Sequence, residues 1–501
     1  MTKITDIKTL GELKKSGYKS RTVKDELRQN LILQLQKREG GFEGIIGFED
    51  TVIPDLQTAI LSRHNILLLG LRGQAKTRIA RLMVNLLDEY VPYIEGSELF
   101  DDPFNPISWY AHNELNIKGD ATPIAWLHRS ERYTEKLATP DVTVADLIGD
   151  VDPIKAATMK LHYSDERVIH FGLIPRAHRG VFVINELPDL QARIQVSLFN
   201  ILQEKDIQIR GFKLRLPLDI QFVFTANPED YTNRGSIVTP LKDRIESQIL
   251  THYPRSVEIS RKITQQEALL SPEQKTAIEV DGLVKDLIEQ IAFEARNSEY
   301  IDKKSGVSAR LTISAFENLV SNAERRMIIN GESSTFVRIT DFLGVIPAIT
   351  GKIELVYEGE QEGPAKVANM MIGKAIKTLM LQFFPDPEKV KKSKAPNPYT
   401  EIINWFGDSN TILLNDDLPL AEYKKSLNSV AGLKDLVKKT HPKLSESQQL
   451  LLMEFVLHGL AEFSQLNKGF LDNGFAFSDM FNSLFNLEPD EDDLDLDDDR
   501  Y

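Results

Sequence analysis

Eight residues near the start of the chain have the types, and nearly the spacing, of a phosphate-binding loop. The usual pattern is G-x-x-x-x-G-K-[ST], whose backbone N–H groups and lysine hold the phosphates while its hydroxyl binds Mg²⁺. In GLRGQAKT (70–77) the first glycine, the lysine and the threonine are in place, but alanine stands where the last glycine belongs. The stretch therefore predicts a site for ATP and Mg²⁺. The predicted phosphate-contacting residues are Gly70, Gly73, Gln74, Ala75, Lys76 and Thr77.

The alanine is the one departure within this loop. Ala75 comes directly before KTRIARLMVNLL (76–87), whose apolar spacing predicts an amphipathic helix. At that position we expect an ordinary negative φ, which alanine adopts without strain. The added methyl group is then tolerated if it points away from the phosphates.

Polar side chains also end two further predicted strands. GVFVINE (180–186) runs through four apolar residues to Asn185 and Glu186, and DIQFVFTANP (219–228) leads to Asn227. Ligands of parallel sheets bind at the carboxyl ends of the strands. An acid at the first position of such a pair holds the Mg²⁺ shell, and the glutamate after it orients the attacking water. Asn185 brings no charge to the metal, so we expect weaker Mg²⁺ retention or slower turnover.

Two arginines lie beyond these strands. Arg244, in TPLKDRIESQI (239–249), could reach the phosphates of another subunit as an arginine finger, although taken singly it also fits a surface arginine. Arg310, in GVSARLTISAFENLV (306–320), starts a predicted helix and could reach back to the nucleotide. Both are predicted catalytic residues, with Glu186 and Asn227.

The elements that must position these side chains predict an α/β fold. Short apolar strands at 65–70, 180–186 and 219–228 alternate with helices, which is typical of a parallel sheet covered on both faces. The later sequence is almost entirely helical in pattern. The predicted organisation is a helical extension at 1–40, an α/β nucleotide-binding core at 41–255, a helical lid at 256–360, a helical C-terminal region at 361–487 with a linker near 384–400, and a disordered acidic tail at 488–501.

Composition narrows the class of protein. The 501 residues contain 42% hydrophobic residues, no cysteine and a net charge of -14, much of it in the final EPDEDDLDLDDDRY. No stretch has the roughly 20 apolar residues of a membrane helix, and nothing resembles a signal peptide, so we expect a cytoplasmic protein. The remaining chain is only mildly acidic, and nucleic acid is not an expected partner. The nine histidines show no zinc-binding spacing.

In this order the motifs resemble an AAA+ ATPase: phosphate loop, strand with glutamate, strand with asparagine, arginine, helical region and second arginine. GIIGFEDTVIPDLQTAI (44–60) and the segment 171–211 are similar to the magnesium chelatase subunit I and MoxR-type branch. The resemblance covers about 41–350. It implies that Ile46 and Gly47 border the adenine, that a helical insert ends before residue 171, and that a β-hairpin lies near 206–216. It also implies a ring, expected to be a hexamer, in which Arg244 acts on the neighbouring subunit.

Three functions follow as hypotheses. The first is a Mg²⁺-dependent ATPase motor that remodels or assembles a partner protein, which in this branch often carries a von Willebrand factor A domain. The second is a true magnesium chelatase motor subunit that drives Mg²⁺ into porphyrin. The third, motivated by Asn185, is a nucleotide-gated scaffold that hydrolyses ATP weakly. Sigma-54-dependent transcriptional activation is not expected, because the sequence has no GAFTGA-like loop.

Overall fold

Two compact units make up the chain, Met1–Tyr253 and Pro254–Tyr501. The computed structural model describes residues 4–162, 165–209, 215–228, 236–392, 396–471 and 473–480. The predicted acidic tail at 488–501, the tip of the predicted hairpin and part of the predicted linker lie outside these residues.

Five strands form the central sheet of the first unit, in the order β11-β1-β10-β7-β4, and every neighbouring pair is parallel. Their bounds are β1 Ile66–Leu69, β4 Tyr133–Leu137, β7 Gly180–Asn185, β10 Ile220–Ala226 and β11 Ser247–Leu250. Strands β1, β7 and β10 are buried along their whole length because helices cover both faces. The predicted α/β fold, with its three buried strands, is confirmed, while β4 and β11 were not predicted.

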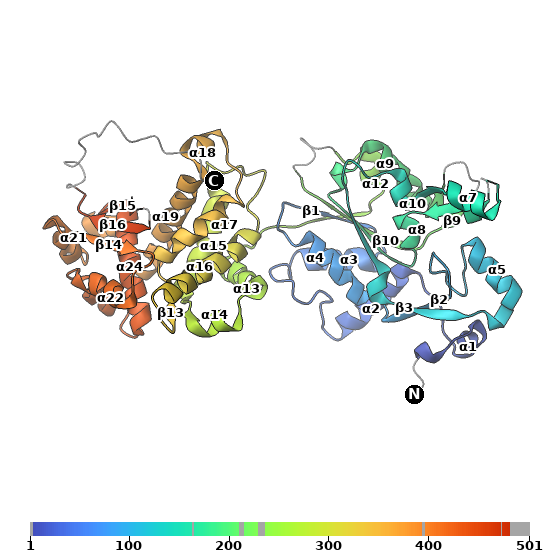
Figure 1. Ribbon diagram of the computed structural model, residues 1–501, viewed down its shortest axis with the longest axis horizontal. Helices are drawn as coiled ribbons and strands as arrows, with labels where there is room; N and C mark the ends of the chain where they lie inside the picture. Colours follow the sequence, from blue (N-terminus) through green and yellow to red (C-terminus); the bar gives the residue numbers. More distant parts are fainter. Residues whose placement is uncertain are drawn as a thin grey trace. The chain divides into compact units, whose positions relative to one another are not determined.

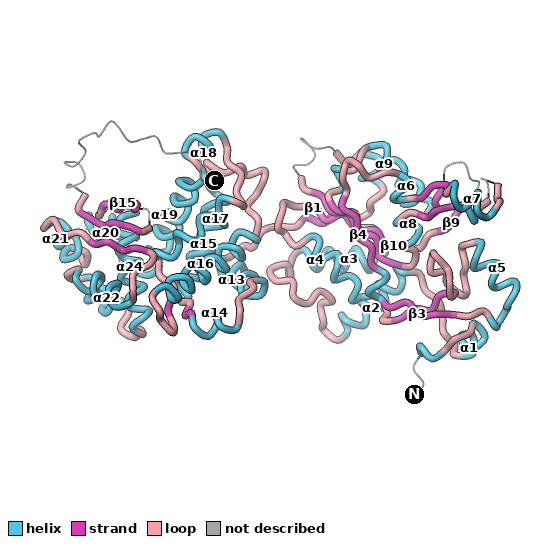
Figure 2. Tube along the Cα trace, in the orientation of Figure 1, coloured by secondary structure: helices cyan, strands magenta, loops and turns pink. Residues whose placement is uncertain are grey.

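Alternate residues of each strand enter two separate hydrophobic layers. Val181 and Val183 face one layer, and Phe182 and Ile184 face the other. Figures 1 and 2 show the helices on the two sides of the strands. The first layer is covered by α2 Val23–Gln36, α3 Val52–Leu61 and α4 Lys76–Leu82. The second is covered by α6 Val144–Leu147, α8 Leu173–Arg176, α9 Ala192–Ser197, α10 Phe199–Glu204 and α12 Thr239–Asp243.

The strand register brings the predicted site residues to one edge. Leu69 pairs with Ala226, so the residues that follow them, Gly70 and Asn227, leave the sheet side by side. On the other side of β10, Phe224 pairs with Ile184 of β7, which is followed directly by the Asn-Glu pair.

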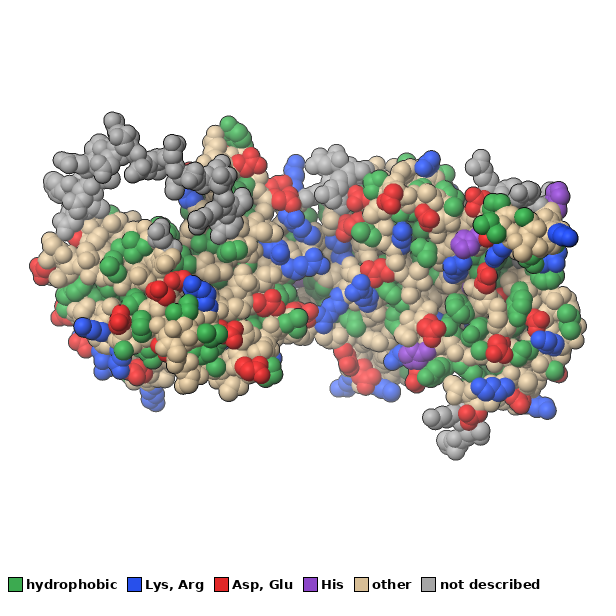
Figure 3. Space-filling model, in the orientation of Figure 1, with side chains coloured by type: hydrophobic (Ala, Val, Ile, Leu, Met, Phe, Trp, Pro, Cys, Tyr) green, Lys and Arg blue, Asp and Glu red, His purple; other side chains and the backbone are tan. Residues whose placement is uncertain are grey.

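Shorter elements decorate the first unit. Strands β2 and β3 pair antiparallel, with α5 between them in the sequence, and β5 pairs with β6 in the same way around α7. Strand β8 pairs with β9 as the expected hairpin. The segment α7 is helical and ends before residue 171, as the resemblance implies. The bounds are α1 Leu10–Lys15, β2 Tyr90–Ile94, α5 Trp109–Lys118, β3 Ile124–His128, β5 Gly149–Val151, α7 Pro153–Met159, β6 Ile169–Phe171, β8 Asp206–Gln208 and β9 Arg215–Pro217. On the face in Figure 3, acidic and basic side chains are interspersed over this unit.

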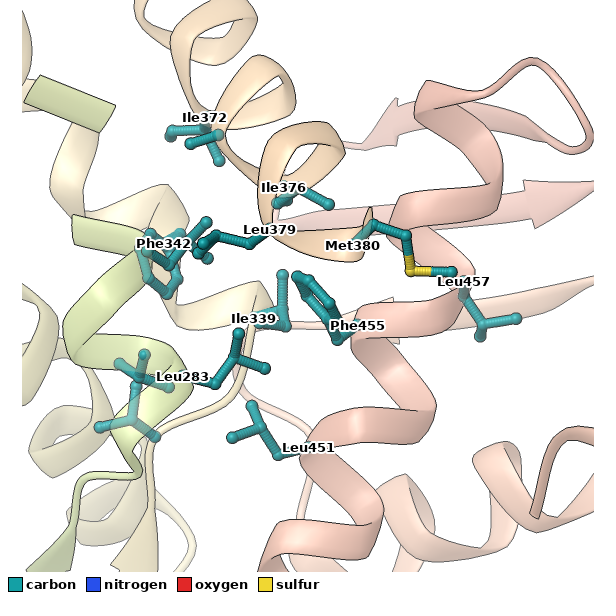
Figure 4. Packing of buried hydrophobic residues seen from close by; sticks show 14 of the residues in the cluster. Leu283, Ile339, Phe342, Ile372, Ile376, Leu379, Met380, Leu451, Phe455 and Leu457 are labelled. Carbon is teal, nitrogen blue, oxygen red and sulfur yellow. The ribbon is translucent and has the colours of Figure 1, made fainter. Parts of the chain in front are cut away.

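The second unit is largely helical and has one hydrophobic core, which runs in sequence from Ile278 to Phe477. Figure 4 shows side chains from α15, α19, α24 and the segment around Phe342 converging there. Its helices are α13 Val257–Glu267, α14 Pro272–Ala277, α15 Gly282–Asn297, α16 Arg310–Ile329, α17 Ile346–Thr350, α18 Tyr357–Glu362, α19 Pro364–Phe383, α20 Pro387–Lys392, α21 Thr400–Gly407, α22 Leu420–Ser429, α23 Leu433–Thr440 and α24 Glu446–Glu462. Its strands are β12 Ile278–Glu279, β13 Thr335–Phe336, β14 Ile412–Asn415, β15 Asn467–Leu471 and β16 Gly474–Ser478.

Buried polar contacts connect the region 361–487 with the region 256–360. Glu454 of α24 accepts hydrogen bonds from the Ile339 N–H at 2.8 Å and the Thr340 N–H at 2.9 Å. Arg326 and Asp341 form a buried ion pair at 2.9 Å beside them. The two regions therefore share one core. The antiparallel sheet β14-β16-β15 in this unit was not predicted.

Candidate active site

The phosphate loop joins β1 to α4 and contains two residues with left-handed backbone. Gly73 has φ +74°, and Ala75 has φ +56° and ψ +15°. Our expectation of a negative φ at Ala75 is therefore wrong. The loop needs the conformation that a Cβ disfavours, and this conformation costs an alanine about 1–2 kcal/mol. That requirement explains why the usual pattern has glycine there.

Gly70 is required for a different reason, which is close approach of side chains. A Cβ on Gly70 would lie 2.0 Å from the Thr251 hydroxyl oxygen and 2.3 Å from Oε1 of Gln74. These two side chains are hydrogen bonded to each other at 2.6 Å. Gln74 is thus buried and braces the loop against the end of β11, where Thr251 lies.

Lys76 is buried, and its ammonium group lies inside the loop. Its Nζ donates to the carbonyl oxygens of Gly70 and Leu71, the latter at 3.0 Å, and to Oδ1 of Asn227 at 2.7 Å. Asn227 in turn donates from Nδ2 to Oε2 of Glu186 at 2.9 Å. The structure therefore brings Lys76, Asn227 and Glu186 together at the ends of β1, β10 and β7.

The backbone at Glu186 turns sharply out of the sheet. Glu186 has φ +53°, and its N–H donates to the Thr225 hydroxyl at 3.2 Å. Thr225 belongs to β10, so the neighbouring strand holds the main chain at this turn. Strained backbone of this kind, of order 1–3 kcal/mol, persists where surrounding structure fixes it and occurs often at active sites.

Asn185 is buried, and both ends of its side-chain amide are hydrogen bonded. Its Nδ2 donates to Oε1 of Glu135 on β4 at 2.6 Å, and its Oδ1 accepts from the Thr225 hydroxyl at 3.1 Å. Glu135 also accepts from Arg81 and from the Tyr133 hydroxyl. Burial alone would raise the pKa of Glu135, but these hydrogen bonds together hold that pKa below its usual value.

The donors at this edge suit a nucleotide with its metal ion. A buried ammonium group matches phosphate charge, and hydroxyl, amide and carboxylate oxygens suit Mg²⁺. Thr77 follows Lys76 at the start of α4, while Asn185 and Glu186 end β7. ATP and Mg²⁺ thus fit the residues present, with Glu186 supplying a carboxylate.

The predicted adenine-side residues lie in the loop before α3. Gly47 has φ +85°, and its N–H donates to the Glu49 side chain at 2.8 Å. Ile46 beside it is half-buried. The following Phe48 packs edge-on against His252 with ring centroids 4.9 Å apart, which ties this loop to the segment after β11.

The two predicted arginines stand at helix termini, and Arg310 belongs to the second unit. Arg244 ends α12 and contacts its own unit, donating to Gln203 at 3.1 Å and to the Pro240 carbonyl at 2.7 Å. Arg310 begins α16 in the second unit and is exposed. The roles of both residues stay predictions.

Sequence reasoning missed Glu135, Arg81 and Thr225. Thr225 stands two residues before the asparagine that was predicted, within a strand that was recognised. Glu135 lies in YTEKL, a mostly polar strand without the apolar run that identified the other three. A charged residue in such a strand gives no pattern that separates a site residue from a surface one.

Within the residues that the structure describes, no helix combines the length and the apolar character of a membrane span. No three or more histidine, aspartate or glutamate side chains there are arranged to hold a metal ion.

The chain is similar to a known family model and to a curated protein. The family model described as the sigma-54 interaction domain matches residues 162–248, a stretch that contains β7, β10 and Arg244. The Archaeal Lon protease of Thermococcus kodakarensis is 28% identical over an alignment of 184 positions, and the match covers 33% of this chain and 27% of that protein. The chain therefore covers about a quarter of its curated relative.

Several solved structures of low identity are also similar. A magnesium chelatase BchI–BchD complex matches with 19% identity, a TM-score of 0.34 and coverage of 64% of this chain and 98% of that one. NtrX from Brucella abortus in complex with ATP matches with 13% identity and a TM-score of 0.33, and the match covers 58% of this chain and 52% of that one. RuvB from Thermotoga maritima matches with 11% identity and a TM-score of 0.36, and the match covers 77% of this chain and 96% of that one. The two sequence matches, together with the α/β site geometry, support an AAA+ ATPase.

Proposed function

We propose that this chain binds Mg·ATP at residues 70–77 and hydrolyses it as a ring-forming motor of the magnesium chelatase subunit I/MoxR-type branch, remodelling or assembling a partner protein. The observation that supports this most is the hydrogen-bonded series Lys76–Asn227–Glu186. A cation for phosphate and a carboxylate for water are thereby placed on neighbouring strands, with an amide between them.

Each side chain then has a definite task. The Lys76 ammonium binds the β- and γ-phosphate oxygens and offsets their charge. Thr77 and Asn185 would hold the Mg²⁺ ion through their side-chain oxygens. Glu186 orients a water molecule in line with the γ-phosphorus and accepts its proton, while Asn227 fixes the carboxylate. Bound Mg²⁺ neutralises charge that develops on the phosphates.

Ring assembly would complete the site. Arg244 lies at the end of α12, and in a ring it would leave its contacts with Gln203 and Pro240 to reach the nucleotide of a neighbour. Arg310, at the start of α16, would report the nucleotide state from the helical unit. The proposed partner is a protein with a von Willebrand factor A domain.

One observation favours a second function, a scaffold that binds ATP but hydrolyses it weakly. The buried position before Glu186 holds an amide, which brings no charge to a metal ion. Both functions require nucleotide binding at Lys76, so they differ in turnover alone.

Two substitutions test the proposal. Lys76→Ala should abolish binding of a fluorescent ATP analogue, whereas Glu186→Gln should retain binding and lose about 10²-fold or more in phosphate release. Lys24→Ala is the matched control, because Lys24 is a partly buried lysine that, like Lys76, donates to an asparagine oxygen, here Asn65 Oδ1 at 2.9 Å. Unchanged nucleotide affinity in Lys76→Ala would contradict the proposed site. Vigorous wild-type turnover that Glu186→Gln abolishes would exclude the scaffold.

Assembly and the partner need separate measurements. Light scattering with and without Mg·ATP should show a nucleotide-dependent ring, and Arg244→Ala subunits should assemble yet lower turnover when mixed with wild type. A pull-down with Glu186→Gln should retain a protein with a von Willebrand factor A domain. Recovery of general chaperones alone would contradict the remodelling role.

A further inference from the structure

Glu135 accepts four hydrogen bonds beside the proposed site, and no part of the proposed hydrolysis uses it. Its Oε1 accepts from Asn185 at 2.6 Å and from Arg81 Nη2 at 3.3 Å. Its Oε2 accepts from Arg81 Nε at 3.0 Å and from the Tyr133 hydroxyl at 2.9 Å. Both oxygens are therefore engaged by donors from three different elements.

These contacts continue from Glu135 to the catalytic glutamate. Asn185 gives its amide N–H to Glu135, so its oxygen turns to the Thr225 hydroxyl. The same hydroxyl oxygen accepts the main-chain N–H of Glu186 at 3.2 Å. The series Glu135–Asn185–Thr225–Glu186 thus runs across β4, β7 and β10 and ends at the left-handed turn that aims Glu186.

We infer that Glu135 is a positioning residue of the hydrolysis site, which fixes the orientation of the Asn185 amide and, through Thr225, the main chain at Glu186. The inference rests on the proposed function. It assigns a role to the unusual amide as well, because an ionised Glu135 requires a hydrogen-bond donor at position 185. Asparagine supplies that donor, and aspartate does not.

A purely structural ion pair would have a different signature. The Arg81 side chain is 65% exposed, and exposed ion pairs contribute little to stability. The contact with Asn185 is shorter than either Arg81 contact and lies at a buried residue. The charged and titratable groups that face Glu135 are Arg81 from α4 and Tyr133 from its own strand, with the neutral Asn185 from β7.

The inference predicts incompatibility between acids at the two positions. Asn185→Asp would place two carboxylates within hydrogen-bond distance, and like charges so close cannot both ionise without cost. Glu135→Gln would leave an amide that can donate to an aspartate at 185. The double variant Glu135→Gln/Asn185→Asp therefore exchanges donor and acceptor, and it should recover what each single change loses.

The first readout needs no nucleotide. Urea unfolding of the first unit is followed by the fluorescence of Trp109 and Trp126, in a Trp405→Phe background that silences the second unit. Asn185→Asp should lower the urea midpoint at pH 7.5, because it removes the hydrogen-bond donor that faces Glu135. The double variant should regain the midpoint. Hydrogen exchange at Glu186 should accelerate in Glu135→Gln.

The second readout is steady-state ATP hydrolysis. Glu135→Gln should lower kcat by about 10-fold, as loss of an orienting partner typically does, with KM for ATP within about twofold because Lys76 is untouched. The double variant should recover most of kcat. Glu131→Gln, which removes an exposed acid just before β4, is the control and should match wild type.

The outcomes separate the two claims. The positioning role would be overturned if the double variant lost as much kcat as the product of the two single losses. An unchanged kcat in Glu135→Gln would also overturn it. So would an Asn185→Asp midpoint equal to that of wild type. Suppose that the urea midpoint falls in Asn185→Asp and returns in the double variant, but the wild type hydrolyses no ATP. That result would instead refute the proposed function, and the positioning role with it.

Discussion

Replacement of Ala75 by glycine should stabilise the first unit. An alanine-to-glycine substitution usually does the opposite and destabilises a protein. Ala75 has φ +56° and ψ +15°, immediately before α4. Its methyl group is only partly buried, against the layer formed by α3 and α4. The substitution therefore removes backbone strain and little packing.

Two opposing terms set the magnitude. A Cβ in the left-handed region costs about 1–2 kcal/mol, which glycine does not incur. Glycine gives the unfolded chain more freedom, which lowers the free energy of unfolding by about 0.4–1 kcal/mol. The difference is a net stabilisation of about 0.5–1 kcal/mol. For a unit of this size it corresponds to a rise in Tm of about 1–4 °C.

The assay is urea unfolding in the Trp405→Phe background, in which Trp109 and Trp126 report on the first unit alone. Ala80→Gly in the same helix is the matched control. Ala80 is fully buried and helical, so glycine should destabilise by about 1 kcal/mol from propensity, plus the loss of a buried methyl group. The two changes are chemically identical and should act with opposite signs.

A loss of stability in Ala75→Gly that equals the loss in Ala80→Gly would refute the reasoning. It would mean that residue 75 has ordinary backbone and that the strain assigned to the loop does not exist. Nucleotide affinity should stay unchanged in Ala75→Gly, because no hydrogen-bonding side chain is altered.

Three further predictions concern other parts of the molecule. Gly70→Ala should cost about 1–3 kcal/mol by overpacking against Thr251, and Thr251→Ala should restore part of that loss in the same urea assay. Burial lowers the pKa of His178 to about 4, so the unfolded state binds more protons between pH 4 and 6.5. The stability of the wild type should accordingly fall by up to about 1.4 kcal/mol per pH unit as pH drops through that window, relative to His178→Asn measured by urea titration. Asp341→Asn should destabilise the second unit by about 3–5 kcal/mol in urea or heat, because it leaves Arg326, which is 1% exposed, with a buried uncompensated charge. A Gly70→Ala or Asp341→Asn variant within 0.5 kcal/mol of wild type would contradict its stated cause, and so would equal pH dependence in wild type and His178→Asn.

Sequence patterns identified the sheet wherever strands are buried on both faces. The strands β1, β7 and β10 read as continuous apolar runs because helices cover both of their sides. The edge strands β4 and β11 have half-buried or alternating residues, and such short polar strands resemble loops. Their place in the sheet is set by pairing with β7 and β1, which a local pattern cannot reveal.

The candidate site divides in the same way. Lys76, Glu186 and Asn227 could be predicted because each follows a recognisable strand or loop at a fixed spacing, and the structure brings them together. Glu135 could not, because its contact with Asn185 crosses 50 residues of sequence through a strand that carries no signal. The backbone of Ala75 was predicted wrongly, because the expectation considered the helix that follows and not the turn that enters it.

The two departures from the phosphate-loop and strand patterns differ in where their cost falls. At Ala75 the cost is backbone strain within the loop, which no neighbouring side chain can relieve, so it lowers stability without moving a hydrogen-bonding group. At residue 185 the replacement of the usual acid by asparagine alters hydrogen bonding, and Glu135 on the adjacent strand accepts the hydrogen bond that the asparagine donates. Restoring the usual glycine should therefore be harmless. Restoring the usual acid should not be, unless Glu135 changes with it, because at that position the residue and its partner form one unit.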